Sequence, residues 1–230
     1  MEEKHFGRET FKMKRIYVYC EGQTEESFVN NLLTDYFSQK EIQVTPIICT
    51  TKRTSVRKFK GGISSFEKFS KELKIICKQH PNEKVTTMID YYGLPNDFPG
   101  INLPEPDIYK KVEQIEVSIK ENIGVENLSV YISLHEFESL LYSEPNVFCS
   151  FGNSVDRQIK EIKENFNNNP EKINDSKETS PSKRILGCIA DYSKISDGTK
   201  LAKEIGIEKM MQECKHFKEW IERLGGFVSS

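Results

Sequence analysis

Acidic side chains gather where three predicted strands end: Glu21 and Glu25, then Asp90, then Glu136 and Glu138. In a parallel α/β sheet the carboxyl ends of the strands meet at one edge, and ligands bind beyond that edge. Carboxylates brought so close repel one another unless protons or a cation intervene. A hard divalent cation such as Mg²⁺ takes oxygen ligands and leaves room for water and phosphate. The pattern therefore predicts a metal site suited to phosphate chemistry.

Each of these acids also has a simpler explanation. Glu25 and its neighbour Glu26 fall in the first turn of a predicted helix, where negative charge is stabilised by the helix dipole. His135, beside Glu136, fits a hydrogen-bonded structural histidine better than a metal ligand. Asp90 is the hardest to explain in this way, because it terminates an otherwise apolar strand.

The elements that would position these acids alternate along the chain. Strands are predicted over 15–20, 42–50, 84–90 and 128–134, with Pro46 placing the second strand near an edge. Helices follow the first three strands. Apolar residues recur from Phe28 to Phe37, Ser64 and Glu67 form a capping box, and Ile108 to Ile119 lead to a closing glycine at 124. This alternation predicts an α/β fold with a mainly parallel sheet flanked by helices.

Three regions are expected along the 230 residues. Residues 1–13 read as a disordered leader and residues 14–150 as the α/β domain. Residues 151–230 read as an all-helical C-terminal cap packed on that domain. Within this cap, the helical stretches RQIKEIKENF and PSKRILGCIADY are joined by a polar connection rich in asparagine and lysine.

Composition limits the classes of function. The hydrophobic fraction is 37 % and the formal net charge is −2, so nucleic-acid binding would need a local basic patch. No apolar run approaches the roughly 20 residues that span a bilayer, and no signal peptide is seen, which predicts a cytoplasmic protein without membrane contact. The six cysteines are scattered without a CxxC pair, so we expect reduced core residues.

Basic residues near the predicted edge could supply phosphate contacts. Lys52, Arg53 and Arg57 lie in the loop after the second strand, at the same end of the sheet as the acids. Lys183 and Arg184 lie at the start of a predicted helix, where phosphate groups are favoured. A solvated loop explains the first group equally well.

Four stretches carry a family resemblance: YCEGQTEESFV, TTMIDYYGLP, YISLHEFESLLYS and INDSKETSPSKRIL. Together they resemble a bacterial family of unknown function that is counted among Toprim-like proteins. Toprim domains occur in topoisomerases, primases and overcoming-lysogenisation-defect (OLD) nucleases. They bind Mg²⁺ through a glutamate after the first strand and aspartates after a later one. The resemblance assigns these roles to Glu21, with Glu25 close by, and to Asp90.

The sequence departs from the Toprim signature at one position. That signature has two aspartates one residue apart, whereas Asp90 is followed by Tyr91 and Tyr92. Asp97, Glu136 or Glu138 would have to replace the second aspartate. The number of metal ions therefore stays open.

Three functions follow from this reading. The preferred one is a Mg²⁺- or Mn²⁺-dependent nuclease or related phosphotransfer enzyme, with catalytic Glu21, Glu25, Asp90 and Glu136 and metal ligands Glu21, Asp90 and Glu138. The resemblance adds a role in phage defence with an ATPase partner. The alternative is a non-catalytic Toprim-like sensor or regulatory subunit of an ATPase complex. A small-molecule phosphohydrolase is the third. The oligomeric state is open, a homodimer included.

Overall fold

The computed structural model describes residues 13–49, 62–174 and 176–226. Its strands form one parallel sheet in the order β2-β1-β3-β4. The short strand β5 also pairs with β3, closer to the carboxyl end of β3 than β4 does. The strands are β1 (Lys14–Cys20), β2 (Ile42–Ile48), β3 (Lys84–Asp90), β4 (Leu128–Ser129) and β5 (Ile132–Ser133). The predicted α/β class, with a mainly parallel sheet flanked by helices, is confirmed.

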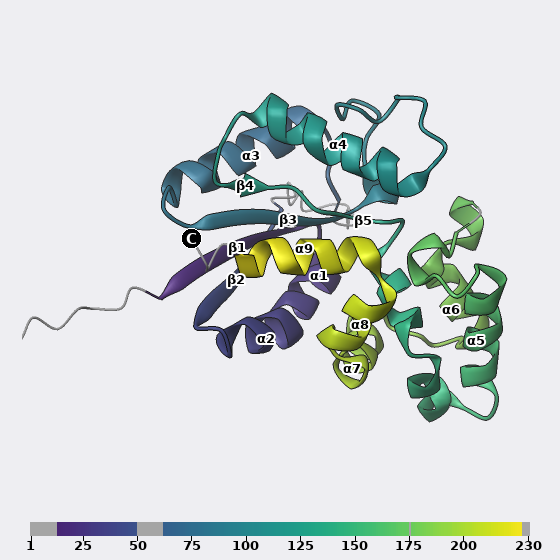
Figure 1. Ribbon diagram of the computed structural model, residues 1–230. Coiled ribbons are helices and arrows are strands. Elements are labelled where there is room, and N and C mark those ends of the chain that lie inside the picture. The colour runs from purple at the N-terminus through teal and green to yellow at the C-terminus, as the bar shows by residue number, and fades with distance from the viewer. Residues whose placement is uncertain (1–12, 50–61, 175, 227–230) are drawn as a thin grey trace, which may run out of the picture.

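Helices cover both faces of the sheet (Figure 1). Helices α3 (Phe66–Gln79) and α4 (Ile108–Ile123) lie on one face. The other face carries α1 (Gln23–Phe28), a π-helical turn (Val29–Leu33), α2 (Thr34–Ser38) and α9 (Lys215–Gly226). The remaining helices lie toward the end of the sheet where the strands terminate: α5 (Val155–Asn165), α6 (Pro181–Cys188), α7 (Ser196–Ile205) and α8 (Ile207–Glu213).

The C-terminal helices share a hydrophobic core with the sheet. Trp220 of α9 is fully buried, and its ring stacks on Tyr131 with centroids 4.1 Å apart. Its indole Nε1 donates to Thr86 Oγ1 of β3 at 2.9 Å.

Predicted strand and helix boundaries are mostly confirmed, including the edge position of β2 with Pro46. The prediction of one continuous strand over 128–134 is wrong. Thr87 Oγ1 donates to Tyr131 O at 2.8 Å and accepts from Tyr131 N at 2.9 Å, so a side chain replaces the strand ladder between β4 and β5. Ser65, rather than Ser64, caps α3 by accepting from Lys68 N.

Helix α7 was not anticipated by the sequence pattern. Lys194 lies in the stretch that joins α6 to α7. Among the described residues, no helix is long and apolar enough to cross a membrane.

The prediction of reduced core cysteines is confirmed in part. All six thiols are free, and four are buried. Cys149 is exposed and Cys188 is half-buried, so neither belongs to the core as expected.

Candidate active site

Glu21 and Asp90 lie side by side, as predicted. Glu21 directly follows β1 and Asp90 ends the adjacent β3. The Asp90 backbone N donates to Glu21 Oε2 at 3.1 Å, and the Glu21 N donates to Met88 O at 3.3 Å. The parallel pairing of the two strands therefore fixes both carboxylates at the carboxyl edge of the sheet.

Gly93 makes room for the Glu21 carboxylate. It ends the 3-10 turn Tyr91–Gly93 that follows β3. A Cβ atom at this position would lie 2.6 Å from Glu21 Oε1 and 2.9 Å from Oε2, closer than real Cβ contacts allow. With any larger residue here the Glu21 carboxylate would have to move, so glycine permits this close approach.

Glu25 combines a capping role with burial. Its Oε2 accepts from Gly22 N at 2.8 Å, which supports the simpler interpretation that this residue stabilises the start of α1. Its side chain is nevertheless buried. Burial raises the pKa of Glu25, and the charge of Glu21 raises it further. Glu26 is less buried and lies in the same turn.

Asp90 is the centre of the electrostatic cluster. Its Oδ1 accepts from Phe137 N at 3.0 Å, which ties the end of β3 to the segment after β5. Burial raises the pKa of Asp90 well above its ordinary value, and the negative charges of the other four acids raise it further: Glu25, Glu21, Glu138 and Glu136. The carboxylates predicted to meet at this edge therefore do repel one another.

Lys194 is the cation of this cluster, and sequence reasoning missed it. Its Nζ lies 3.1 Å from Glu138 Oε1 and 3.8 Å from Glu136 Oε1. Burial lowers the pKa of Lys194, but the charges of Glu138 and Glu136 outweigh that effect and raise it. No periodic or motif signal marks the stretch DYSKIS, so only the fold reveals this contact.

Glu138 and Glu136 occupy different environments. Glu138 is 1 % exposed, and burial raises its pKa to about 7 despite the neighbouring lysine. Glu136 Oε2 accepts from Ser182 N at 3.0 Å, at the start of α6. Glu136 thus anchors the C-terminal helices to the sheet edge.

His135 joins three of the four stretches that carried the family resemblance. Its Nδ1 lies 2.9 Å from Asn174 Nδ2, which also bonds the Tyr92 hydroxyl. Its carbonyl accepts from Tyr92 N at 3.2 Å. Burial lowers the pKa of His135 to about 4, so the ring is neutral near pH 7. The expected hydrogen-bonded structural histidine is confirmed, on a left-handed backbone with φ of 72°.

Four buried polar side-chain atoms lack a hydrogen bond among the described residues, and two of them are Ser133 Oγ and Glu138 Oε1, the latter paired with Lys194 at 3.1 Å. The other two are Tyr192 Oη and Asn174 Oδ1. The negative charge of Glu138 adds to burial in raising the pKa of Tyr192, which places this hydroxyl near the cluster. Buried polar groups are normally satisfied, so these atoms are exceptions to that rule.

Other predicted site residues lie apart from the cluster. Asp97 Oδ2 accepts from Phe66 N at 2.9 Å and caps α3 instead of replacing a second aspartate. Arg184 Nε donates to Thr179 O at 2.7 Å, and its guanidinium lies 4.9 Å from the centre of the Phe166 ring.

The other predicted phosphate contacts gain no direct support. The Ser182 amide in the first turn of α6 serves Glu136, so a carboxylate already lies at the helix start foreseen for phosphate beside Lys183. Lys52, Arg53 and Arg57 lie outside the described residues.

The fold and the site define an α/β protein with a partly buried acidic cluster at the carboxyl end of its sheet. The sequence matches the family described as "Domain of unknown function (DUF4276)" over residues 20–225, so the chain belongs to this family. No curated protein and no solved structure matches the chain.

Proposed function

We propose that this protein is a metal-dependent nuclease or a related phosphotransfer enzyme that acts on nucleic acid. One observation carries the proposal: Asp90, which is partly buried, lies amid four further carboxylates, and their charges add to desolvation in raising its pKa. A purely structural role would be served by asparagine or glutamine without this repulsion. A site that keeps the acids is suited to a cation that is not part of the chain.

The donor atoms fit a hard divalent cation. All are carboxylate oxygens, and neither Glu21 Oε1 nor Asp90 Oδ2 accepts a hydrogen bond from the residues that the structure describes. Glu21, Asp90 and Glu25 would hold Mg²⁺ or Mn²⁺, while Lys194 already pairs with Glu138. No three acids, histidines or cysteines of the described chain already form a metal-binding group, so side chains would have to turn inward. A bound ion would polarise a phosphate and lower the pKa of an attacking water.

The chain's own groups would assist in distinct ways. Lys194 Nζ supplies positive charge beside the carboxylates, where charge develops on a phosphate. Glu138, with a pKa of about 7, can hold or release a proton at neutral pH. Glu21 and Asp90 each accept one backbone amide, which holds both carboxylates at the edge of the sheet while their second oxygens turn toward an ion.

The wider role follows from the Toprim-like resemblance and belongs to the same proposal. It comprises phage defence in the cytoplasm together with an ATPase partner. A homodimer is compatible with this role.

A non-catalytic sensor or regulatory subunit of an ATPase complex is the second candidate. Two observations favour it: Tyr92 stands where Toprim domains carry a second aspartate, and Lys194 already neutralises part of the acidic charge. In this case the carboxylates would serve only to tie segments together.

Calorimetric titration with Mn²⁺ tests the proposal. Wild type should bind, and Asp90→Asn should not, since the amide keeps the shape but loses the charge. Asp97→Asn is the matched control, because Asp97 also accepts a backbone amide but lies at α3. Far-ultraviolet circular dichroism checks that each variant folds.

Cleavage assays then separate the candidate functions. A labelled oligonucleotide and p-nitrophenyl phosphate are each incubated with Mn²⁺. Cleavage of the oligonucleotide supports the nuclease, and hydrolysis of the small ester alone supports the phosphohydrolase. A folded wild type that binds no Mn²⁺, with or without oligonucleotide, refutes the metal site and leaves the regulatory candidate.

A further inference from the structure

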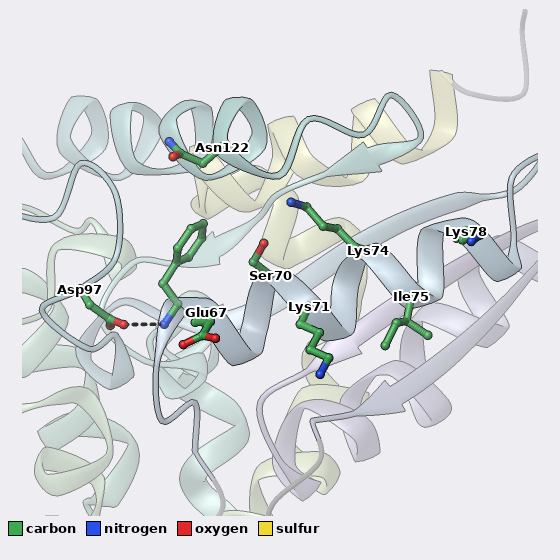
Figure 2. Close-up of a pocket in the computed structure, with 9 residues that line it drawn as sticks. Glu67, Ser70, Lys71, Lys74, Ile75, Lys78, Asp97 and Asn122 are labelled. Atoms are coloured by element: carbon green, nitrogen blue, oxygen red, sulfur yellow. Dashed lines mark hydrogen bonds between the residues drawn. The ribbon is translucent and has the colours of Figure 1, made fainter.

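Helix α3 carries a row of lysines on its solvent side. Lys71, Lys74 and Lys78 line a surface hollow of about 740 Å³, together with Ser70 and other residues of α3 and its surroundings. Figure 2 shows Lys74 reaching toward α4, where Asn122 lies, while Lys71 leaves the helix on the other side. The chain as a whole has a net charge of −2, so this row is a local exception.

The basic surface continues past the end of α3. Lys74 and Lys78 also line a second hollow, of about 540 Å³, which includes Lys84 at the start of β3. Lys84 lines a third hollow, of about 370 Å³, with Lys120 and Arg223. Shared residues therefore join the three hollows into one band, which we call the α3 band.

Like charges in the α3 band are close enough to affect one another. Burial lowers the pKa of Lys84, and the charges of Lys120 and Arg223 lower it further. Acids line each hollow of the band as well: Glu67 and Asp97 at one end, Glu126 in the middle, and Glu113 and Glu116 at the other end.

The three α3 lysines are not used for internal ion pairs. None of Lys71, Lys74 and Lys78 pairs with an acid in the part of the chain that the structure describes. Exposed lysines elsewhere, such as Lys160 and Lys215, do pair with a glutamate four residues on. The α3 row thus leaves positive charge available to a partner.

We propose that the α3 band binds the phosphodiester backbone of a nucleic acid, with Lys71, Lys74 and Lys78 as its phosphate contacts. This inference deepens and rests on the proposed function, since it names the surface that holds the substrate strand. From Lys71 to Lys78 the helix rises by about 10 Å. One strand of B-form DNA presents about three phosphates along that length of axis. Lysines contact phosphates as point charges and without regard to base sequence.

Fluorescence anisotropy with a labelled 20-nucleotide DNA tests the band, in EDTA so that cleavage and metal binding play no part. Lys71→Gln/Lys74→Gln/Lys78→Gln is compared with Lys160→Gln/Lys215→Gln/Lys218→Gln, which removes the same charge from exposed positions on other helices. Each phosphate contact makes the affinity fall by roughly a further threefold when the salt concentration rises from 50 to 200 mM. The α3 variant should therefore bind at least about tenfold more weakly and lose nearly three units of salt slope, roughly 0.9 for each of its three contacts. The control should bind nearly as wild type does.

Three outcomes overturn the α3 band. Wild type binds no oligonucleotide, both triple variants weaken binding equally, or labelled poly-glutamate binds as tightly as DNA and loses affinity in the same variant. The last outcome would make the band a docking surface for an acidic protein. Metal-free DNA binding that depends on α3, without Mn²⁺-dependent cleavage, would instead support the band and refute the nuclease. Cleavage with unchanged binding by the α3 variant would support the nuclease and refute the band.

Discussion

Replacing Glu138 by glutamine should change how folding stability depends on pH. Glu138 is 1 % exposed, and burial raises its pKa from 4.5 to about 7. The folded protein therefore keeps a proton on this group in a pH range where the unfolded chain has lost it. Glutamine has nearly the same shape but no proton to release.

The size of the effect follows from the pKa values. A group whose pKa is raised by folding contributes most to stability below its unfolded pKa, and this contribution falls until the folded pKa is passed. Each pKa unit is worth about 1.36 kcal/mol. Between pH 4.5 and pH 7.5 wild type should lose about 3 kcal/mol of unfolding free energy relative to Glu138→Gln.

Urea unfolding in EDTA measures this difference across the pH range. Trp220 is the only tryptophan in the chain and is fully buried against Tyr131, so its fluorescence reports unfolding directly. Both proteins are measured at half-unit steps, and the difference in unfolding free energy is plotted against pH.

Glu213→Gln supplies a control, because folding lowers the pKa of Glu213 whereas it raises the pKa of Glu138. Burial raises the pKa of Glu213, but hydrogen bonds from Lys163 and Lys209 outweigh it, so the net pKa is lowered. The contribution of Glu213 is therefore present above pH 4.5 and is lost as the pH falls through its folded pKa. If the wild-type and Glu138→Gln stabilities run parallel from pH 4.5 to pH 7.5, Glu138 does not occupy the environment described.

Two further substitutions probe the same cluster. Gly93→Ala should push Glu21 off the Asp90 amide, cost about 1–3 kcal/mol of stability and weaken Mn²⁺ binding in calorimetry. Gly187→Ala, whose added Cβ meets nothing within 4 Å, should do neither, and equal losses in both variants would contradict the close packing at Gly93. Lys194→Met should remove the cation beside Glu138 and tighten Mn²⁺ binding by roughly tenfold at pH 7. Weaker Mn²⁺ binding in that variant would mean that Lys194 supports the site instead of competing with the ion.

The placement of Glu21 and Asp90 could be predicted because it depends on strand order alone. Both residues end apolar strands, and parallel pairing of β1 with β3 brings them together at one edge. The same argument located Glu136 and Glu138 near that edge. Local patterns were sufficient wherever one strand or helix decides the position of a residue.

Lys194 and Asn174 could not be predicted, because their positions depend on how the C-terminal helices return to the sheet. Both lie in polar connections whose composition carries no periodic signal. The break between β4 and β5 could not be predicted either, because Thr87 is β-branched and its side chain is typical of a regular strand. Its hydroxyl competes with the ladder only when Tyr131 lies opposite.

Three of the clustered acids are each tied to a backbone amide of another segment, while Glu138 pairs with Lys194. Glu21 accepts from Asp90, Asp90 accepts from Phe137, and Glu136 accepts from Ser182, so the bonds pass from β1 through β3 to α6. Hydrogen bonds to charged groups contribute about 1.5–3 kcal/mol each, which offsets part of the repulsion.

The repulsion that remains should appear as a stability deficit at neutral pH, and a cation that binds only the folded protein would remove it. On this reasoning Mg²⁺ or Mn²⁺ should raise the unfolding free energy more at pH 7.5 than at pH 5, where protons already relieve Asp90 and Glu138. Thermal unfolding with and without 5 mM ion at the two pH values, on wild type and Asp90→Asn, decides the point. An equal effect of the ion at both pH values, or in both proteins, would mean that the cation does not act through these carboxylates.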